Sequence, residues 1–445
     1  MAQLIVSISG IRGIVGDGLG PAEARRFGLA FGAHLGGGPV VLGRDSRSTG
    51  PMLADAVVEG LLATGCGVLD VGILSTPGIS LMVRRRRARG GMVITASHNP
   101  APYNGIKLLS CEGMALDRDR GRRVVELYEQ NPFAGAEAQG AAEPVADAAA
   151  THVECVLAIL NVEIIRGRGF SVVLDPVNGA GGREMTMLLE RLGCAATVIH
   201  GEPTGDFARG PEPVPENLAA LCSAVTGAQA DLGLALDPDA DRLALVDERG
   251  RAVGEEYTLA LAARHRLAQQ GGPVAANLST SRMMDHVAEE AGVRLHRTPV
   301  GELNVAEAIL RHGCVIGGEG NGGVIDPRVV PVRNSLVGAG LVLEMMATRN
   351  RRLSELCADL PVYTMVKDKV PLGDTDPETV FDAVRQRFPG ARLDERDGLH
   401  LARDDGWIHI RPSNTEPVLR IMAEAGDAST ARAWVTAVKA LVTGP

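Results

Sequence analysis

The chain is organised around the segment Thr95-Ala96-Ser97-His98-Asn99-Pro100, which follows the short apolar run Met92 to Ile94. An apolar run that ends in small polar residues and a proline predicts a buried strand opening into a loop. Such a loop holds the Ser97 hydroxyl at the mouth of a sheet, where ligands of open α/β sheets usually bind. Because a serine beside a histidine is more often simple turn chemistry, the interpretation depends on the rest of the chain.

Strands and helices alternate around this stretch. The glycine-rich segment 10–16 is predicted to be a turn, which is either a plain hairpin turn or a close approach to a ligand with Arg12 facing an anion. The alternation is typical of a mostly parallel sheet covered by helices. The remaining predicted elements are strands at 4–9, 39–43 and 68–73, and helices at 21–35, 51–64, from 76 and at about 120–130.

The same pattern recurs twice, and each time a late apolar strand ends in a polar loop. Residues 231–236 lead into Asp237-Pro238-Asp239-Ala240-Asp241-Arg242, and residues 314–317 lead into Gly318-Glu319-Gly320-Asn321-Gly322-Gly323. Three loops in equivalent places predict one central cleft lined by three similar α/β domains.

The last part of the chain has a different pattern. Alternating strands, a hairpin through Asp404-Asp405-Gly406 and a closing helix at 428–441 predict a smaller α+β domain. The predicted domains are 1–150, 151–252, 253–365 and 366–445, with residues 134–149 as a linker or a weak helix.

Composition limits the function. With 445 residues the chain is too long for one core, and its net charge of −9 argues against a nucleic-acid partner. The basic run 84–87 is expected to be a solvated helix end. Seven widely spaced cysteines without a C-x-x-C pair indicate reduced thiols in a cytoplasmic protein. We expect no signal peptide, and the apolar segment 336–347 is too short to span a bilayer, so no membrane partner is expected.

Three carboxylates, Asp237, Asp239 and Asp241, stand at alternate positions. In an extended backbone they fall on one face, and their repulsion is costly unless a cation neutralises it. Oxygen ligands of this kind suit Mg²⁺, with a phosphate oxygen completing the shell. An EF-hand fits less well, because its sixth position is Arg242 instead of glycine, although Glu248 matches the twelfth. A solvated acidic turn is the simpler alternative.

A second polar cluster lies near the end of the chain and suits a phosphate dianion, because it combines guanidinium, hydroxyl and amide groups. Its members are Arg411, Ser413, Asn414, Thr415 and Arg420. Glu319 and Asn321, flanked by glycines, could bind sugar hydroxyls at close range. Lys107 is a candidate general acid or base that gains weight from following the Ser97 loop.

The loops at 95–100, 237–242, 318–323 and 411–417 resemble, in order, the four signature loops of the α-D-phosphohexomutase family. The resemblance covers essentially the whole chain. It implies a phosphohexomutase with four domains around a central cleft, in which Ser97 is phosphorylated and binds Mg²⁺ with Asp237, Asp239 and Asp241.

The resemblance also implies further roles. Lys107 is the expected acid or base, with His98 as the alternative base, and Arg12 lies near the phosphoserine. We assign Arg242 to the substrate, together with Glu319 and Asn321 for the sugar. The non-reacting phosphate is held by Arg411, Ser413, Asn414, Thr415 and Arg420.

The expected reaction converts a hexose 6-phosphate into the 1-phosphate through a bisphosphorylated sugar, with hexose 1,6-bisphosphate as activator. The substrate is predicted to be glucosamine phosphate, with mannose or glucose phosphate close behind. A Mg²⁺-dependent sugar phosphatase and a non-catalytic phosphosugar-binding protein remain alternatives. A dinucleotide-binding oxidoreductase is set aside, because no G-x-G-x-x-G joins a strand to a helix in the first unit. A monomer or a homodimer is expected.

Overall fold

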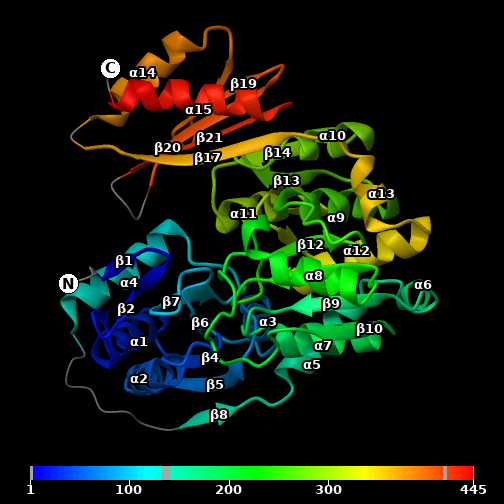
Figure 1. Cartoon of the computed structure of the whole chain (residues 1–445). Helices are drawn as coiled ribbons and strands as arrows, with labels where there is room; N and C mark the ends of the chain where they lie inside the picture. The colour runs from blue at the N-terminus through cyan, green and yellow to red at the C-terminus, as the bar shows by residue number, and fades with distance from the viewer. Residues whose placement is uncertain (1–3, 133–140, 374, 414–417, 444–445) are drawn as a thin grey trace.

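The computed structural model describes residues 4–132, 141–373, 375–413 and 418–443. These residues form four sheets, each with its own helices, and we call the four units domains I to IV in chain order. Domains I and II lie side by side, domain III lies above them, and domain IV lies at the far end (Figure 1). The predicted architecture of three α/β domains and one α+β domain is confirmed.

Domain I has a mixed sheet in the order β1-β2-β7-β6-β4-β5-β8, with β3 beside β2. The strand β4 is parallel to β5 and β6, whereas β7 is antiparallel to β6 because a short loop joins the two. The strands are β1 Ile5–Ser7, β2 Gly10–Val15, β3 Gly18–Leu19, β4 Gly38–Arg44, β5 Cys66–Ile73, β6 Gly90–Ile94, β7 Tyr103–Ser110 and β8 Ala142–Pro144. The helices are α1 Pro21–Leu35, α2 Gly50–Leu62, α3 Thr76–Arg85 and α4 Arg118–Gln130.

Two predictions for domain I are wrong. The segment 10–16 is not a turn, because residues 10–15 form β2, which pairs antiparallel with β7. Gly10 is needed for this pairing, since a Cβ there would lie 2.0 Å from the Ile106 carbonyl oxygen. The predicted linker contains β8, which pairs with β5, and the helix α5 begins at Ala148. Part of that linker, 133–140, lies outside the described residues.

Domains II and III repeat one topology. Their sheets, β10-β9-β11-β12 and β14-β13-β15-β16, each have two parallel pairs followed by an antiparallel edge strand. One continuous apolar core spans both domains and surrounds α12, which is buried along most of its length. At 15 residues α12 does not cross a bilayer, and none of the helices in the described chain is long and apolar enough to do so.

The elements of domain II are α5 Ala148–Leu157, α6 Val162–Arg166, β9 Ser171–Asp175, α7 Gly182–Arg191, β10 Ala195–Val198, a 3₁₀ turn Pro215–Asn217, α8 Ala219–Gly227, β11 Leu232–Leu236 and β12 Leu243–Asp247. Those of domain III are α9 Glu255–Gln269, β13 Val274–Asn277, α10 Met283–Glu290, β14 Leu295–Thr298, α11 Glu302–His312, β15 Ile316–Glu319, β16 Gly323–Ile325, α12 Ser335–Arg349 and α13 Leu353–Ala358.

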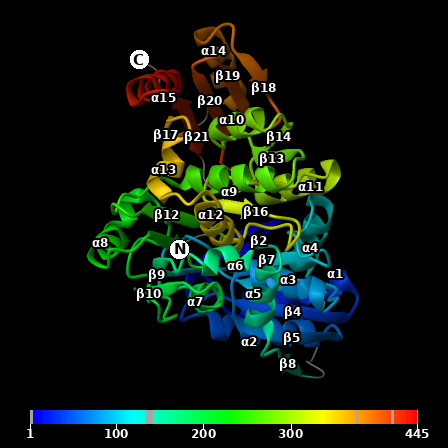
Figure 2. The ribbon, with the colours of Figure 1, turned by 90° about the vertical axis from the view of Figure 1, so that its right-hand side faces the viewer.

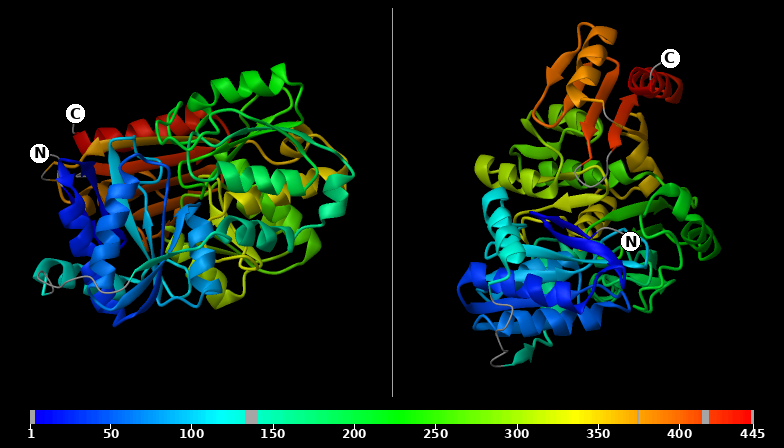
Figure 3. Two further views of the ribbon diagram at one scale, coloured as in Figure 1. Left: turned by 90° about the horizontal axis from the view of Figure 1, so that it is seen from below. Right: turned by 90° about the vertical axis from the view of Figure 1, so that its left-hand side faces the viewer.

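Domain IV is an antiparallel sheet, β17-β21-β20-β19-β18, with its own apolar core and two helices. It stacks on the β13 and α10 side of domain III and stands apart from domain I (Figures 2 and 3). The predicted hairpin is present as β19 and β20. The elements are β17 Thr364–Pro371, α14 Pro377–Arg387, β18 Arg392–Asp394, β19 Leu399–Arg403, β20 Gly406–Pro412, β21 Val418–Ala425 and α15 Ala428–Thr443.

Candidate active site

Asp237, Asp239 and Asp241 lie in a buried turn that follows β11. The Ala240 amide donates to the Asp237 carbonyl at 3.0 Å, and Ala240 has a φ of +53°. The trio lies in the loop just after the strand, as expected, but this loop is a turn and its backbone is not extended as we assumed. The turn still gathers the carboxylates, because one oxygen of each lies within 4.8 Å of the others.

In Asp239 and in Asp241, one carboxylate oxygen accepts a hydrogen bond from a basic side chain and the second oxygen does not. Lys107 Nζ lies 2.6 Å from Asp239 Oδ2, and Arg333 donates to Asp241 Oδ2 at 2.5 Å. The Oδ1 atoms of Asp239 and Asp241 are buried and have no hydrogen-bond partner among the described residues. Because an unpartnered buried carboxylate oxygen is costly, these atoms are suited to a cation. Hard divalent cations prefer such ligands, so the residues present fit Mg²⁺.

The charges of the trio act on one another. Burial and then the neighbouring Asp241 and Asp239 raise the pKa of Asp237 well above its usual range. Burial also acts to raise the pKa of Asp239, but the charge and hydrogen bond of Lys107 outweigh it and lower that pKa overall. A cation shared by the three carboxylates would relieve this repulsion.

Ser97 lies next to the trio. Its Oγ is 3.3 Å from Asp237 Oδ2 and 3.3 Å from His98 Nδ1, and its φ is +49°. Arg47, which is almost fully buried, donates to the Ser97 carbonyl at 2.7 Å and to the Asn99 carbonyl at 2.8 Å. The guanidinium group of Arg47 thus fixes the backbone that presents the Ser97 hydroxyl.

Two adjacent strands supply cations near Ser97. Lys107 is on β7, the strand that follows the Ser97 loop, and it reaches Asp239. Arg12 is on β2 and donates to Asn99 Oδ1 at 2.9 Å. Burial, followed by the charges of Arg242 and Arg12, lowers the pKa of His98 to about 2, so this imidazole is neutral. Arg242 itself donates to Glu212 at 2.6 Å.

The predicted sugar loop joins β15 to β16. Glu319 Oε1 accepts from Asn277 Nδ2 at 2.8 Å and from the Gly301 amide at 3.2 Å, while Asn321 lies 3.5 Å from Glu319 Oε2. Gly322 is pressed against the strand that follows the aspartate turn, because its carbonyl accepts from the Leu243 amide at 3.1 Å. The sugar loop and the aspartate turn are therefore in direct contact.

The predicted phosphate loop joins β20 to β21. Arg411 and Arg420 face each other across these two strands, and the Ser413 amide donates to the Val418 carbonyl at 2.9 Å. Arg411 Nε is buried and has no hydrogen-bond partner in the described part of the chain. Burial lowers the pKa of Arg411, although the charges of Asp397 and, less strongly, Glu319 oppose this. Asn414 and Thr415 lie outside the described residues.

Models of one protein family match the chain along almost its whole length. They describe phosphoglucomutase/phosphomannomutase domains I, II, III and the C-terminal domain, and they match residues 4–135, 150–250, 254–363 and 369–441. A phosphoglucomutase/phosphomannomutase of Thermococcus kodakarensis is 40% identical, over 96% of this chain and 95% of its own. The chain belongs to the phosphoglucomutase/phosphomannomutase family.

Other relatives agree with this assignment. A probable phosphoglucosamine mutase of Methanopyrus kandleri is 39% identical, over 95% of this chain and 94% of its own. The crystal structure of a putative phosphomannomutase from Thermus thermophilus has a TM-score of 0.86 at 27% identity and covers 100% of both chains. The predicted family is confirmed, and the chain is an enzyme that isomerises phosphosugars by intramolecular phosphoryl transfer.

Sequence reasoning missed two arginines that organise the site. Arg47 holds the Ser97 loop, and Arg333 holds Asp241 and Glu319. Arg333 precedes Asn334, which caps α12 by accepting from two amides of the first turn. No local motif marks either arginine, because Ser97 lies 50 residues from Arg47 and Asp241 lies 92 residues from Arg333 in the chain.

Proposed function

We propose that the protein interconverts the 6-phosphate and 1-phosphate of a hexose through a phosphorylated Ser97, with glucosamine phosphate as its preferred substrate. The observation that carries this proposal is the position of Ser97 Oγ beside Asp237, next to the unpartnered Oδ1 atoms of Asp239 and Asp241. A hydroxyl in this position can carry a phosphoryl group whose charge a cation on the three carboxylates offsets.

Mg²⁺ held by Ser97, Asp237, Asp239 and Asp241 would supply charge neutralisation for phosphoryl transfer. Proton transfer to and from the sugar is the task of the chain's own side chains. Lys107 Nζ lies beside Asp239 and His98 Nδ1 lies beside Ser97 Oγ, so both are candidates to exchange a proton with a sugar hydroxyl. Lys107 is favoured, because the lowered pKa of His98 makes its imidazole a weak base.

The remaining predicted residues would bind the substrate. Arg12 and Arg242 flank the phosphoserine, and Glu319 and Asn321 face the sugar. Arg411, Ser413 and Arg420, with Asn414 and Thr415, would hold the non-reacting phosphate. One such phosphate site serves both halves of the reaction if the bisphosphorylated sugar turns over between them, and hexose 1,6-bisphosphate would then prime Ser97.

The choice of glucosamine phosphate rests on charge. Glu302 and Glu319 project from neighbouring elements of domain III toward one guanidinium, that of Arg333. Two carboxylates against one guanidinium leave a negative surplus, which favours the ammonium group of glucosamine over a hydroxyl. The related archaeal protein named as a probable phosphoglucosamine mutase supports the same choice.

Seven free cysteines support a cytoplasmic location.

The test is a coupled assay with Mg²⁺ and a trace of hexose 1,6-bisphosphate, comparing kcat/KM for the 6-phosphates of glucosamine, mannose and glucose. We expect glucosamine phosphate to lead and Ser97→Ala to lose turnover. Glu302→Gln is expected to lower kcat/KM for glucosamine phosphate roughly tenfold and that for glucose phosphate less, because a charged hydrogen bond is worth about 1.5–3 kcal/mol.

Glu307→Gln is the matched control, because Glu307 lies on the same helix and forms a loose ion pair of 3.7 Å with the exposed Arg311. Equal rates on mannose and glucose phosphate would replace the glucosamine assignment with a broad hexose specificity. Release of inorganic phosphate at the rate of substrate loss would indicate a phosphatase instead.

A further inference from the structure

Arg333 contacts carboxylates from three different segments. It donates to Asp241 Oδ2 at 2.5 Å, to Glu302 Oε2 at 2.7 Å and to Glu319 Oε2 at 2.8 Å. Its side chain is only 11% exposed. The guanidinium therefore bridges the aspartate turn of domain II and the sugar loop of domain III.

The backbone around Arg333 is fixed by its neighbours. Asn334 Nδ2 lies 2.8 Å from the buried His152 Nε2, and Ser335 Oγ donates to the Ala240 carbonyl at 2.7 Å. The backbone of Arg333 is thus anchored at the start of α12, and its contacts with the three carboxylates are not incidental surface contacts. Such anchoring is expected of a side chain that positions others.

One guanidinium charge is shared among three carboxylates. A divalent cation on the unpartnered Asp241 Oδ1 would offset the charge of that carboxylate and weaken its attraction for the guanidinium on Oδ2, so Arg333 would be held more by Glu319 and Glu302. Those are the two carboxylates assigned to the sugar.

We propose that Arg333 is a positioning residue that couples cation binding at the aspartate turn to sugar binding at the Glu319 loop. The inference rests on the proposed function of these two loops. Arg333 is a counter-ion of Asp241 and of Glu319. When a cation on Asp241 Oδ1 offsets the charge of that carboxylate, Arg333 binds Glu319 more firmly and fixes it in the orientation that receives the sugar. By linkage, the bound sugar strengthens cation binding by the same factor.

The experiment is calorimetric titration of dephosphorylated protein, which cannot turn over, with Mg²⁺, with glucosamine 6-phosphate, and with each in the presence of the other. In the wild type we expect Mg²⁺ to strengthen sugar phosphate binding at least about fivefold, a typical coupling. In Arg333→Met this factor falls to below about twofold. Mg²⁺ affinity without sugar stays level or rises, because the competing guanidinium is gone.

The sign of the Mg²⁺ effect separates positioning from a general loss of structure. A structural role would weaken Mg²⁺ and sugar phosphate together. Arg328→Met is the matched control, since Arg328 lies five residues before Arg333 and donates to the buried Asp326, which belongs to neither loop. We expect it to keep the full coupling. Arg333→Lys retains the positive charge but lacks the several N–H donors of the guanidinium, so it should keep only part of the coupling. This variant replaces Arg333→Met in the experiment if Arg333→Met does not fold.

Three outcomes would overturn the proposal. Coupling that survives unchanged in Arg333→Met or Arg333→Lys removes Arg333 from the link while leaving the proposed function intact. Mg²⁺ affinity that falls in parallel with the coupling assigns Arg333 a structural role. A wild type that binds neither Mg²⁺ nor the sugar phosphate would instead refute the proposed function, and this inference with it.

Discussion

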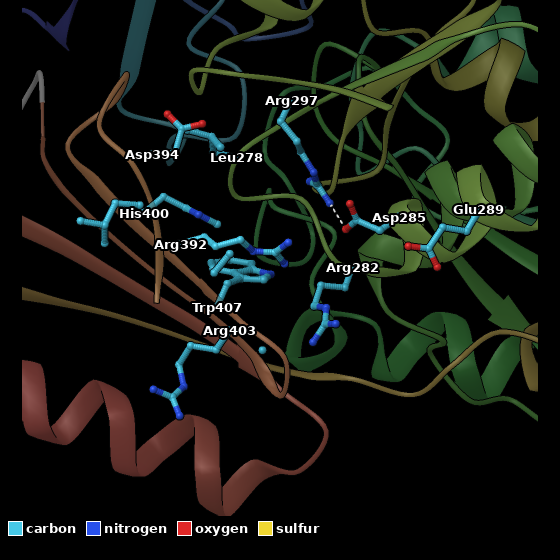
Figure 4. Close-up of a pocket in the computed structure, with 13 residues that line it drawn as sticks. Leu278, Arg282, Asp285, Glu289, Arg297, Arg392, Asp394, His400, Arg403 and Trp407 are labelled. Atoms are coloured by element: carbon cyan, nitrogen blue, oxygen red, sulfur yellow. Dashed lines mark hydrogen bonds and ion pairs between the residues drawn. The ribbon is translucent and has the colours of Figure 1, made fainter. Parts of the chain in front are cut away.

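His400 shows how burial of one side chain makes a domain sensitive to pH. Burial, and then the charges of His409 and Arg297, lower the pKa of His400 to about 3, although Asp394 opposes them. The ring stacks on Trp407 beside a cavity of about 450 Å³ between domains III and IV (Figure 4). Because the unfolded chain has a histidine pKa near 6.5, the unfolded state binds more protons between these values.

Domain IV should therefore lose stability as the pH falls below about 6.5. We expect its free energy of unfolding to drop by about 2 kcal/mol between pH 7 and pH 5. Tryptophan fluorescence during denaturant unfolding measures this, because both tryptophans, Trp407 and Trp434, lie in domain IV. His400→Phe keeps the stacked ring and cannot bind the proton, so its stability should change less with pH. An equally steep dependence in this variant would assign the effect to other groups.

At the same scale, the sequence predicted those residues that lie together in the chain. Ser97 and the three aspartates were found because each sits in a short motif with recognisable chemistry. Arg333 was not found, because its partners Asp241 and Glu302 lie 92 and 31 residues away. A lone arginine before a helix carries no local pattern, and only the packing of α12 between domains II and III gives it a role.

Among the elements, the sugar loop depends on a glycine where two loops meet. Gly322 has a φ of +85°, and a Cβ there would lie 2.3 Å from the Leu243 carbonyl oxygen. Gly322→Ala must therefore separate the sugar loop from the strand after the aspartate turn. We expect it to weaken glucosamine 6-phosphate binding at least about tenfold and to destabilise the fold by more than about 1 kcal/mol, because steric clash adds to left-handed strain.

Gly292→Ala isolates the backbone contribution to this effect. Gly292 has a φ of +63°, and a Cβ there would have no atom within 4 Å, so the substitution introduces the strain without the clash. It should lose about 1 kcal/mol of stability and keep its affinity for the sugar phosphate. Equal binding by both glycine variants would show that contact between the two loops does not matter to the sugar.

The elements that were predicted correctly have local signals. The helix predicted at 21–35 has proline in its first turn and a glycine after its last residue, and the helix in the structure has the same bounds. The prediction of a turn at 10–16 is wrong because the glycines of this segment are typical of a turn, whereas its partner strand β7 lies about ninety residues further on. Pairing with a distant strand overrides local preference, and a single sequence does not reveal that partner.

Across the whole molecule, domains I, II and III are tied together by a buried polar chain. Glu184 accepts from the Ser75 amide and hydroxyl, His152 Nδ1 lies 2.6 Å from Glu184, and Asn334 Nδ2 lies 2.8 Å from His152 Nε2. Asn334 uses its oxygen to cap α12, so its amide must donate and Nε2 must accept. The proton of the ring therefore sits on Nδ1, where it is donated to Glu184.

His152→Ala removes the middle of this chain and leaves Glu184 and the Asn334 amide without their partner. Because burying an unsatisfied polar or charged group is costly, we expect a loss of about 2–4 kcal/mol. The loss should lower the calorimetric Tm of the unit made of domains I to III. The tryptophan transition of domain IV should stay in place, because domain IV has a core of its own.

His312→Ala is the matched control, since His312 is exposed on α11 and stacks on His296. Its Tm should match that of the wild type. If His152→Ala moves the tryptophan transition as far as the calorimetric one, domain IV does not unfold independently and the chain is one cooperative unit. If neither transition moves, the buried chain contributes no net stability. The three domains would then be held together by the apolar core around α12.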